Sequence, residues 1–312
     1  MKKNAKFECG WAIDMQVFRS LDEYTRQSGK RRLAMALGNF DGLHRGHCAV
    51  LRHIFDDAAL VPAVFTFREP PLAALCGYAP KLLLSLAQKE AILAEMGVQV
   101  LIEAEFAEVR DMSSDAFLAF LQESLGVEKI TVGYDCRFGA GGAGDAQTLR
   151  DFGETHGLSC VVEPPVRHGG EVISSTRIRA CIEFGAVDEA AIMLSRPYAF
   201  CGAVLHGQRR GRMLDFPTLN QAWDTAFVCP RYGVYASTAV IAGEQYRAVT
   251  NIGVRPTYPL DVPLAETHVI GFSGDAYGQE VCITLERYLR EERQFPDAQA
   301  LREQLRQDVE SR

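Results

Sequence analysis

The sequence predicts a two-module chain: a parallel α/β sheet covered by helices, then a small, mostly β barrel with a C-terminal helix. At about 100 to 200 residues per domain, a length of 312 residues indicates two domains. In the first half, short β-rich runs alternate with amphipathic helical patterns, which is typical of a parallel sheet. After Arg196-Pro197 the pattern changes to closely spaced short strands with Gly and Pro turns. We place the modules at residues 1–184 and 185–312.

The elements of the first module follow from hydrophobic periodicity and from helix start and stop signals. A Ser-x-x-Gln capping box at Ser85 opens one helix, and Gly97 ends it. The expected strands span Leu33–Leu37, Ala63–Phe67, Val100–Glu103, Lys129–Gly133 and Ser159–Glu163. The expected helices span Gly46–Ala59, Ser85–Met96, Ser114–Leu125, Ala146–His156 and Thr176–Phe184. Such sheets bind their ligands at the carboxyl ends of the strands.

The second module opens with a helix at Val187–Ser195 and continues with β-strands. Two of these flank Ala242-Gly243-Glu244 in the manner of a hairpin. The expected strands span Tyr232–Ile241, Gln245–Asn251, Thr267–Phe272 and Glu280–Leu289. From Asp297 on, the helical spacing of Leu301, Leu305 and Val309 predicts a helix that docks one apolar face on the barrel.

Composition and charge exclude several classes of protein. With 33 basic and 40 acidic residues the net charge is −7, which is the opposite of a nucleic-acid-binding footprint. No run approaches the roughly 18 apolar residues of a membrane span. Nine cysteines without a C-x-x-C spacing favour reduced core thiols over a zinc site or a disulfide framework. We therefore expect a cytoplasmic protein with neither a nucleic-acid nor a membrane partner, and self-association stays open.

The first motif that can carry chemistry is G-N-F-D-G-L-H-R-G-H at residues 38–47, directly after a strand. His44 and His47 are three residues apart where a helix begins, so they share one face. A helix N-terminus also offers free N–H groups to an anion. With Gly38, Asn39 and Gly46, the histidines can bind a nucleotide phosphate. The alternative is an ordinary turn with surface histidines, which the glycine-flanked loop disfavours.

The second motif is I-S-S-T-R-I-R at residues 173–179, where the helix that ends at Phe184 begins. Its hydroxyl groups, on Ser174, Ser175 and Thr176, and the forked guanidinium of Arg179 suit phosphate oxygens. Ser and Thr are also favoured as helix caps, so a purely capping role is the alternative. Together with the first motif, this one predicts the two phosphate clamps of one nucleotidyltransferase.

A glycine-rich run at residues 139–145, G-A-G-G-A-G-D, formally contains a dinucleotide fingerprint, with Glu163 19 residues beyond Gly144. It keeps an NAD-dependent oxidoreductase open as a remote alternative. In that fingerprint, however, the glycines directly follow the strand. Here residues 134–138 separate them from it, so we prefer a mobile glycine loop beside the nucleotide pocket.

In the second module, H-G-Q-R-R-G-R-M-L-D-F-P-T-L-N at residues 206–220 joins a basic loop to a turn presenting Thr218 and Asn220. Such a loop can wrap phosphates, and the Thr218 hydroxyl suits Mg²⁺, which prefers oxygen ligands. A charged β-turn is the alternative. The candidate phosphate ligands of the loop are Gly207, Arg209, Gly211 and Arg212. Further on, N-I-G-V-R-P-T at residues 251–257 is followed by Glu266 at a strand start, where a lone glutamate is usually only solvated.

In this order, the motifs resemble the bacterial bifunctional riboflavin kinase/FMN adenylyltransferase family, also called FAD synthetase. The resemblance implies a Rossmann-like nucleotidyltransferase domain followed by a six-stranded riboflavin kinase barrel. It implies that Glu266 is the kinase base and that Thr218 and Asn220 contact ATP and Mg²⁺. It also implies a flavin site, to which we assign Asn251, Arg255 and Thr257.

The implied reactions are phosphorylation of riboflavin to FMN with ATP, and adenylylation of FMN to FAD with release of pyrophosphate. FMN and FAD would be products rather than bound cofactors. The first reaction needs positioning and a carboxylate that accepts the hydroxyl proton. In the second, the FMN phosphate is already largely ionised at neutral pH. His44, His47 and Arg179 would then offset repulsion between anions.

The sequence departs from the family pattern at several positions. Thr66-Phe67-Arg68-Glu69-Pro70-Pro71 stands where many members read T-F-D-P-H-P. The glycine run lacks the cations that other members often have there. These departures keep a second function open, that of a riboflavin kinase whose N-terminal half is a weak or inactive adenylyltransferase acting in binding or regulation.

Overall fold

A computed structural model describes residues 15–29, 31–206, 216–254 and 262–312 of the chain. The chain forms two compact units. The first comprises residues 1–80 and 84–172, and the second comprises residues 81–83 and 173–312. This grouping assigns α7 (Ser175–Glu183) to the second unit. The expected boundary at 184/185 divides the two proposed activities, and it stays a prediction. It differs from the boundary at 172/173 between the compact units.

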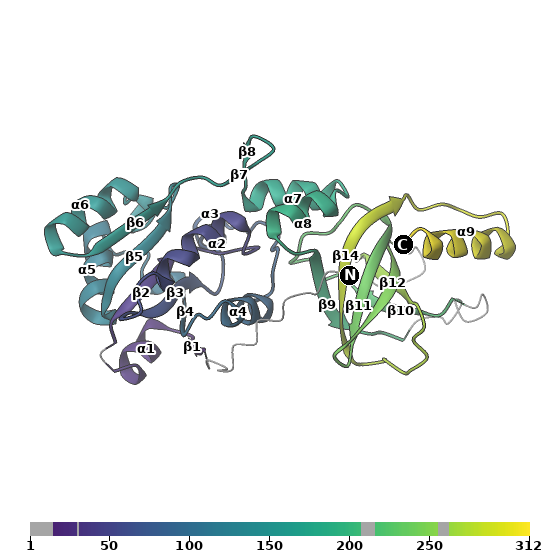
Figure 1. Cartoon of the computed structure of the whole chain (residues 1–312), viewed down its shortest axis with the longest axis horizontal. Helices are drawn as coiled ribbons and strands as arrows, with labels where there is room; N and C mark the ends of the chain where they lie inside the picture. The colour runs from purple at the N-terminus through teal and green to yellow at the C-terminus, as the bar shows by residue number, and fades with distance from the viewer. Residues whose placement is uncertain (1–14, 30, 207–215, 255–261) are drawn as a thin grey trace. The chain divides into compact units, whose positions relative to one another are not determined.

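The first unit contains a six-stranded sheet in which every neighbouring pair is parallel (Figure 1). Its strands are β1 (Gln16–Phe18), β2 (Leu33–Leu37), β3 (Val61–Phe67), β4 (Val100–Ala104), β5 (Val127–Gly133) and β6 (Ser159–Glu163). Their order in the sheet is β1-β4-β3-β2-β5-β6. The order reverses between β2 and β5, which is the place where open α/β sheets bind ligands. The predicted parallel sheet is confirmed, with β1 as an additional edge strand.

Both faces of this sheet are buried, as parallel sheets require. Along β2, Met35 belongs to one core cluster together with Leu118, whereas Ala36 belongs to the other together with Leu51. The helices of the unit are α1 (Leu21–Gln27), α2 (Arg45–Arg52), α3 (Pro71–Cys76), α4 (Leu86–Glu95), α5 (Ser114–Leu125) and α6 (Ala146–His156). Short 3-10 turns follow at η1 (His53–Phe55), η2 (Phe106–Glu108) and η3 (Ala140–Gly142), and β7 (Arg167–His168) pairs with β8 (Glu171–Val172). The predicted capping box of α4 forms between Ser85 and Gln88.

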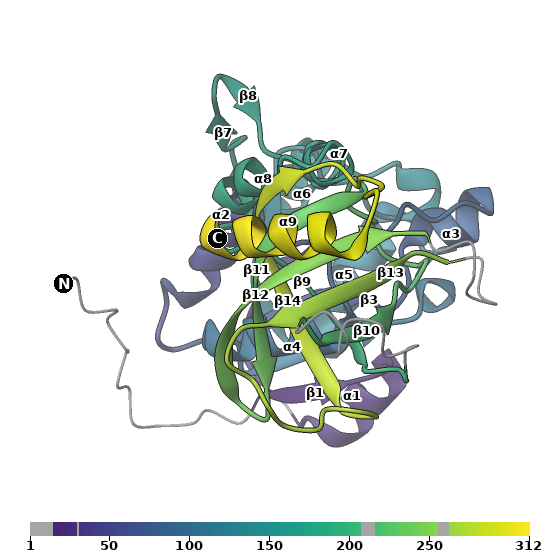
Figure 2. The ribbon, with the colours of Figure 1, turned by 90° about the vertical axis from the view of Figure 1, so that its right-hand side faces the viewer.

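The second unit is a six-stranded antiparallel half-barrel preceded by α7 and α8 (Val187–Leu194) (Figure 2). Its strands are β9 (Tyr198–Ala203), β10 (Thr218–Ala222), β11 (Gly233–Ile241), β12 (Glu244–Gly253), β13 (Leu264–Val269) and β14 (Glu280–Arg290), in the order β10-β13-β12-β11-β14-β9. The buried amide of Gln221 in β10 donates to the carbonyls of Gly202 and Val281, each at 2.8 Å. This side chain links the two edge strands of the sheet.

A disulfide between Cys201 and Cys282 corrects the expectation that the cysteines are all reduced. The two residues face each other across the antiparallel pair of β9 and β14, although they are 81 residues apart in the sequence. Spacing along the chain does not reveal such a pairing, because strand register creates it. Among the other described cysteines, Cys136 is a free thiol whose pKa burial raises to about 12. Its position fits a core thiol.

No helix in residues 15–29, 31–206, 216–254 or 262–312 combines the length and the apolar character needed to cross a bilayer.

The C-terminal helix α9 (Ala298–Glu310) begins at the predicted cap, Asp297, and packs on β11 and β12. Its strongest polar anchor is Asp308, which is 3 % exposed. The Arg290 guanidinium of β14 donates to both oxygens of this carboxylate, at 2.8 and 2.6 Å. Two parallel charge-assisted bonds of this kind fix orientation as well as distance.

We expect Asp308→Ala to lower the free energy of unfolding of the second unit by about 3 kcal/mol, because it leaves the Arg290 charge buried without its carboxylate. Denaturant titration followed by Trp223 fluorescence in a Trp11→Phe background would measure the change, since the chain has two tryptophans. Glu303→Ala is the matched control on the same helix, because its pair with Arg306 is exposed. The control should shift stability by less than about 0.5 kcal/mol. Equal losses in the two variants would contradict the assigned role of the buried pair.

Candidate active sites

The loop between β2 and α2 lies at the switch point of the first sheet. Phe40 and Leu43 have φ values of 49° and 41°, in the left-handed region that few residues other than glycine adopt. Such strain persists only where the surroundings enforce it. Both side chains are fully buried, at 1 % and 0 % exposure. The Gly38 N–H donates to the Phe65 carbonyl at 3.2 Å, so the loop is held to β3 where it leaves the sheet.

His44 and His47 come together at the start of α2, as the sequence predicts. His44 is the N-cap residue, and its Nδ1 accepts a hydrogen bond from the His47 N–H at 3.3 Å. An accepting Nδ1 places the proton of a neutral His44 ring on Nε2. The two rings are stacked with centroids 3.6 Å apart, and the Phe40 and His47 rings form a T-shaped pair with centroids 5.4 Å apart. Two imidazoles are thus held side by side at the positive end of a helix dipole, with Gly46 in the first turn.

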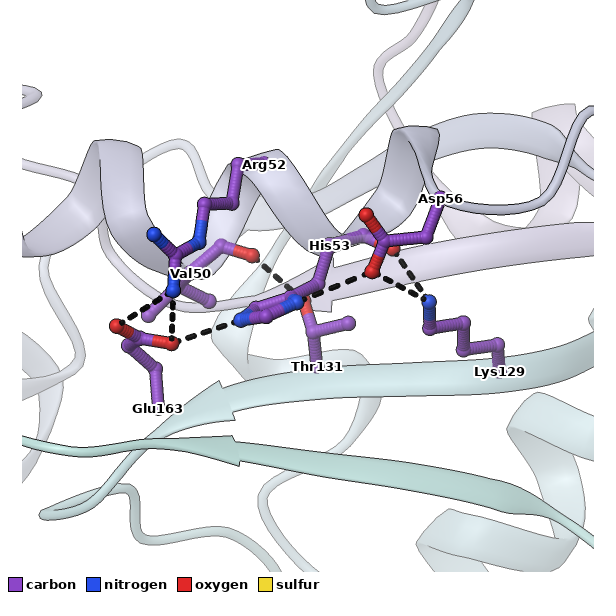
Figure 3. Close-up of polar contacts among 7 residues, drawn as sticks. All are labelled: Val50, Arg52, His53, Asp56, Lys129, Thr131 and Glu163. Carbon is purple, nitrogen blue, oxygen red and sulfur yellow. Dashed lines mark hydrogen bonds and ion pairs between the residues drawn. The ribbon is translucent and has the colours of Figure 1, made fainter.

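A row of hydrogen bonds and ion pairs connects the other end of α2 to β5 and β6 (Figure 3). His53 lies between two carboxylates, with Nε2 2.7 Å from Glu163 and Nδ1 3.1 Å from Asp56. Lys129 of β5 donates to Asp56 at 3.2 Å. Hydrogen bonds from His53 and Lys129 lower the pKa of Asp56. Glu163, the acidic residue of the dinucleotide alternative, is therefore engaged in structural contacts, which also include Arg52.

The glycine run at residues 139–144 forms a closed turn rather than a phosphate-binding turn after a strand. Phe138 and Gly144 exchange backbone hydrogen bonds of 3.1 and 2.9 Å. A Cβ on Gly144 would lie 2.5 Å from the Phe138 ring, so this glycine permits close packing. Asp145, not a glycine, caps α6. The dinucleotide fingerprint is therefore not formed, and the expected mobility of this loop stays a prediction.

The I-S-S-T-R-I-R motif lies at the start of α7 in the second unit. The Ser174 hydroxyl accepts from the Arg177 N–H at 3.2 Å, so it caps the helix. The capping role proposed as an alternative is therefore real for this residue. Ser175 and Thr176 form the first turn, and Arg179 Nε donates to the Lys81 carbonyl at 2.6 Å. Because these residues and the two histidines belong to different units, their union in one nucleotide site stays a prediction.

In the half-barrel, strand register brings three predicted residues together. Glu266 of β13 faces Asn220 of β10 on one side and Asn251 of β12 on the other. Residues that face each other in antiparallel strands point to the same side of the sheet, with Cβ atoms about 5 Å apart. Thr218 is two residues before Asn220 and shares that side. Glu266 is largely buried, at 9 % exposure.

The structure corrects two details of the kinase motif. Thr218 and Asn220 lie in strand β10 rather than in a turn, because β10 pairs with β13 from Thr218 onward. Glu266 is the third residue of β13 rather than the first. The first error arises from Pro217, whose turn signal hides the strand that begins directly after it. As a result, a ladder of backbone bonds fixes the backbone of all three residues.

Two further residues belong to this region. Glu292, which no motif contains, accepts a hydrogen bond from the Asn251 amide at 2.8 Å. It approaches Gly253 so closely that a Cβ there would lie 2.2 Å from its Oε1. His268 faces Thr218 and contacts the Pro217 carbonyl at 2.9 Å through Nδ1. His268 is two residues after Glu266 in the sequence, whereas only the structure brings Glu292 to this region.

Six predicted site residues lie outside the described part of the chain. They are Gly207, Arg209, Gly211, Arg212, Arg255 and Thr257. Their phosphate-binding and flavin-binding roles stay predictions.

Family comparisons assign each half of the chain separately. The sequence model of FAD synthetase matches residues 26–177, and that of riboflavin kinase matches residues 194–312. The two histidines fall in the first match, and Asn220, Asn251 and Glu266 fall in the second. The two matches therefore coincide with the two clusters of candidate residues.

The similarity to known proteins extends over nearly the whole chain. A Pseudomonas fluorescens protein is 34% identical over 301 residues, covering 95% of this chain and 96% of that protein. A Bacillus subtilis protein is 33% identical over 284 residues, covering 88% and 89%. Both are named bifunctional riboflavin kinase/FMN adenylyltransferase. A crystal structure from Streptococcus pneumoniae, titled a macrolide-efflux protein, superposes with a TM-score of 0.84 at 28% identity, covering 96% of this chain and 98% of that one.

The fold of both units, the two family matches and the full-length relatives agree. The chain belongs to the family of bifunctional riboflavin kinases/FMN adenylyltransferases.

Proposed function

We propose that this chain performs both reactions of its family and that each module predicted from the sequence carries one of them. The module at residues 185–312 phosphorylates riboflavin to FMN with ATP. The module at residues 1–184 transfers the adenylyl group of a second ATP to FMN, which gives FAD and pyrophosphate. The single observation that carries the proposal is the register of β10, β13 and β12, which sets Glu266 between Asn220 and Asn251.

In the kinase step, Glu266 accepts the proton of the riboflavin 5′-hydroxyl as that oxygen attacks the γ-phosphate. Strand pairing on both sides fixes the backbone that carries this carboxylate. Asn251 then orients the flavin, and its own amide is held by Glu292. Together with Arg255 and Thr257, it forms the proposed flavin site.

Mg²⁺ fits the donor set on β10. The Thr218 hydroxyl and the Asn220 amide offer the oxygen ligands that this ion prefers. The Asn220 Nδ2 is directed to the Thr218 carbonyl at 3.4 Å, so Oδ1 is the atom that it would offer. A bound Mg²⁺ supplies neutralisation of phosphate charge. The loop residues Gly207, Arg209, Gly211 and Arg212 complete the proposed ATP site.

In the adenylyl-transfer step, the FMN phosphate attacks the α-phosphate of ATP. This nucleophile is ionised at neutral pH, so the protein must reduce repulsion between anions rather than remove a proton. Gly38, Asn39 and Gly46 shape the loop in which His44 and His47 present their rings at the N-terminus of α2. Ser174, Ser175, Thr176 and Arg179 form the proposed second clamp.

The proposal includes the partners and location of the chain. Its partners are the small molecules riboflavin, FMN and ATP, with no nucleic acid and no membrane. A cytoplasmic location follows from the use of ATP as a substrate in both steps.

We expect Glu266→Gln to lower the rate of FMN formation by about 10² to 10⁴, because the amide cannot accept the hydroxyl proton. Chromatography of products from riboflavin, ATP and Mg²⁺ measures this rate. FAD formation from supplied FMN is the internal control and should be unchanged. An FMN formation rate within threefold of the unsubstituted protein would reject Glu266 as the base.

We expect His47→Ala to lower FAD formation from FMN by about 10² to 10³, the typical cost of losing one preorganised donor. FMN formation from riboflavin should be retained. His156→Ala, which removes an exposed histidine of the same unit, is the matched control. Near-normal FAD production by His47→Ala would rule out the proposed role. If the unsubstituted protein forms FMN but no FAD, its first unit acts in binding or regulation instead.

A further inference from the structure

A buried lysine of α4 is bound to the loop that leads to the two histidines. Lys89 is 7 % exposed, and its ammonium donates to the Asn39 carbonyl at 2.9 Å. The Thr66 hydroxyl of β3 donates to the same carbonyl at 3.1 Å and lies 3.4 Å from the Lys89 ammonium. One backbone oxygen therefore accepts from two different elements. Burying a charged amine is costly, so this arrangement is more than incidental packing.

Opposite charges surround the ammonium. Burial lowers the pKa of Lys89, whereas Asp41 of the loop and Glu103 of β4 act in the opposite direction. Glu103 faces Thr66 across the β3–β4 pair and is fully buried. Burial raises the pKa of Glu103, while Arg19 and Lys89 lower it and Glu90 raises it. Lys89 thus connects α4 to the loop and to β3 by hydrogen bonds, and to β4 by charge.

The loop needs such a restraint because its backbone is strained. Phe40 follows the bonded carbonyl directly and adopts a left-handed φ of 49°, and Leu43 does the same at 41°. Each such residue costs about 1 to 3 kcal/mol and must be held by its surroundings. Phe40 then contacts the ring of His47. A shift of the Asn39 carbonyl would therefore move Phe40 and, through it, the ring of His47, the proposed phosphate ligand.

We propose that Lys89 is a positioning residue for adenylyl transfer, whose ammonium holds the strained Gly38–Leu43 loop so that His44 and His47 meet the nucleotide phosphates. This inference rests on the roles proposed above for the two histidines. Lys89 acts through the loop and does not touch the reacting atoms. An error of about 1 Å in the position of a catalytic group can cost about 10²-fold in rate.

The central test is Lys89→Met, which removes the ammonium but keeps an unbranched side chain. We expect kcat for FAD formation from FMN to fall about 10- to 100-fold, with KM for FMN within about threefold, because correct placement matters most in the transition state. Lys89→Arg, which keeps the charge and N–H donors, should recover part of the loss. FMN formation by the second unit should be unchanged.

Lys129→Met is the matched control. Lys129 is also buried, at 8 % exposure, and its ammonium also donates to a backbone carbonyl, that of His53 at 2.6 Å. It anchors the opposite end of α2, away from the loop. Both variants should lower the thermal midpoint, but only Lys89→Met should change kcat more than threefold. Equal effects on kcat would overturn the proposal.

A double-mutant cycle identifies the route of the effect. In a His47→Ala background, Lys89→Met should lower kcat for FAD formation by less than about threefold. Residues that act through one another do not have additive effects on the rate. Additive losses would overturn the proposal. Full kcat for Lys89→Met with a large loss for His47→Ala would overturn this inference alone. Normal FAD formation by His47→Ala would overturn the proposed function and this inference with it.

Thr66→Val provides a second, independent variant if Lys89→Met does not fold at the assay temperature. It removes the other donor to the Asn39 carbonyl and leaves the lysine in place. We expect a several-fold loss of kcat for FAD formation with KM for FMN retained. Full kcat in folded Thr66→Val, checked by circular dichroism, would overturn the role assigned to this carbonyl.

Discussion

Strand β2 of the first unit is buried on both faces, and this constraint organises everything around the candidate adenylyl-transfer site. Alternate residues such as Met35 and Ala36 point into two separate cores, so helices must cover both faces of the sheet. The strand order reverses beside β2, and open α/β sheets bind ligands at the carboxyl ends of their strands at such a point. The chain must then turn from a strand into α2 within a few residues. Left-handed backbone at Phe40 and Leu43 makes that sharp turn and delivers His44 to the helix start.

In the second unit, strand register rather than a loop places the candidate site residues. Asn220, Asn251 and Glu266 come from three strands, and the pairing of β13 with both neighbours puts them on one side of the sheet. On the alternate positions, the buried hydroxyls of Ser237, Thr250 and Thr267 form a chain with 2.8 and 2.9 Å contacts. These hydrogen bonds connect β11, β12 and β13, so a shift in register would break them. Specific pairing thus protects the geometry of the candidate kinase site.

The sequence predicts most of the first unit because its signals are local. Helices α5 and α6 and strand β6 were expected with the bounds that the structure has, since glycines and caps mark their ends. Features that depend on residues far apart in the sequence are not predicted. The Cys201–Cys282 disulfide and the strand character of Thr218 result from pairing across the sheet. Lys89 escapes notice for another reason: a lysine in an amphipathic helix is ordinarily exposed, and only the fold shows that this one is buried.

Charge accounts for why a lysine, rather than an apolar residue, occupies the position next to the loop. The chain carries a net charge of −7, yet its proposed substrates are polyanions, so positive potential must come from local groups. The loop that carries the proposed phosphate ligands itself contains the carboxylate of Asp41. An apolar residue at position 89 could fill the volume, but it would remove a positive charge that interacts with Asp41 next to the proposed phosphate ligands. The Lys89 ammonium interacts favourably with Asp41. It thereby restrains the backbone of the loop and also reduces the repulsion that the loop would exert on an anion.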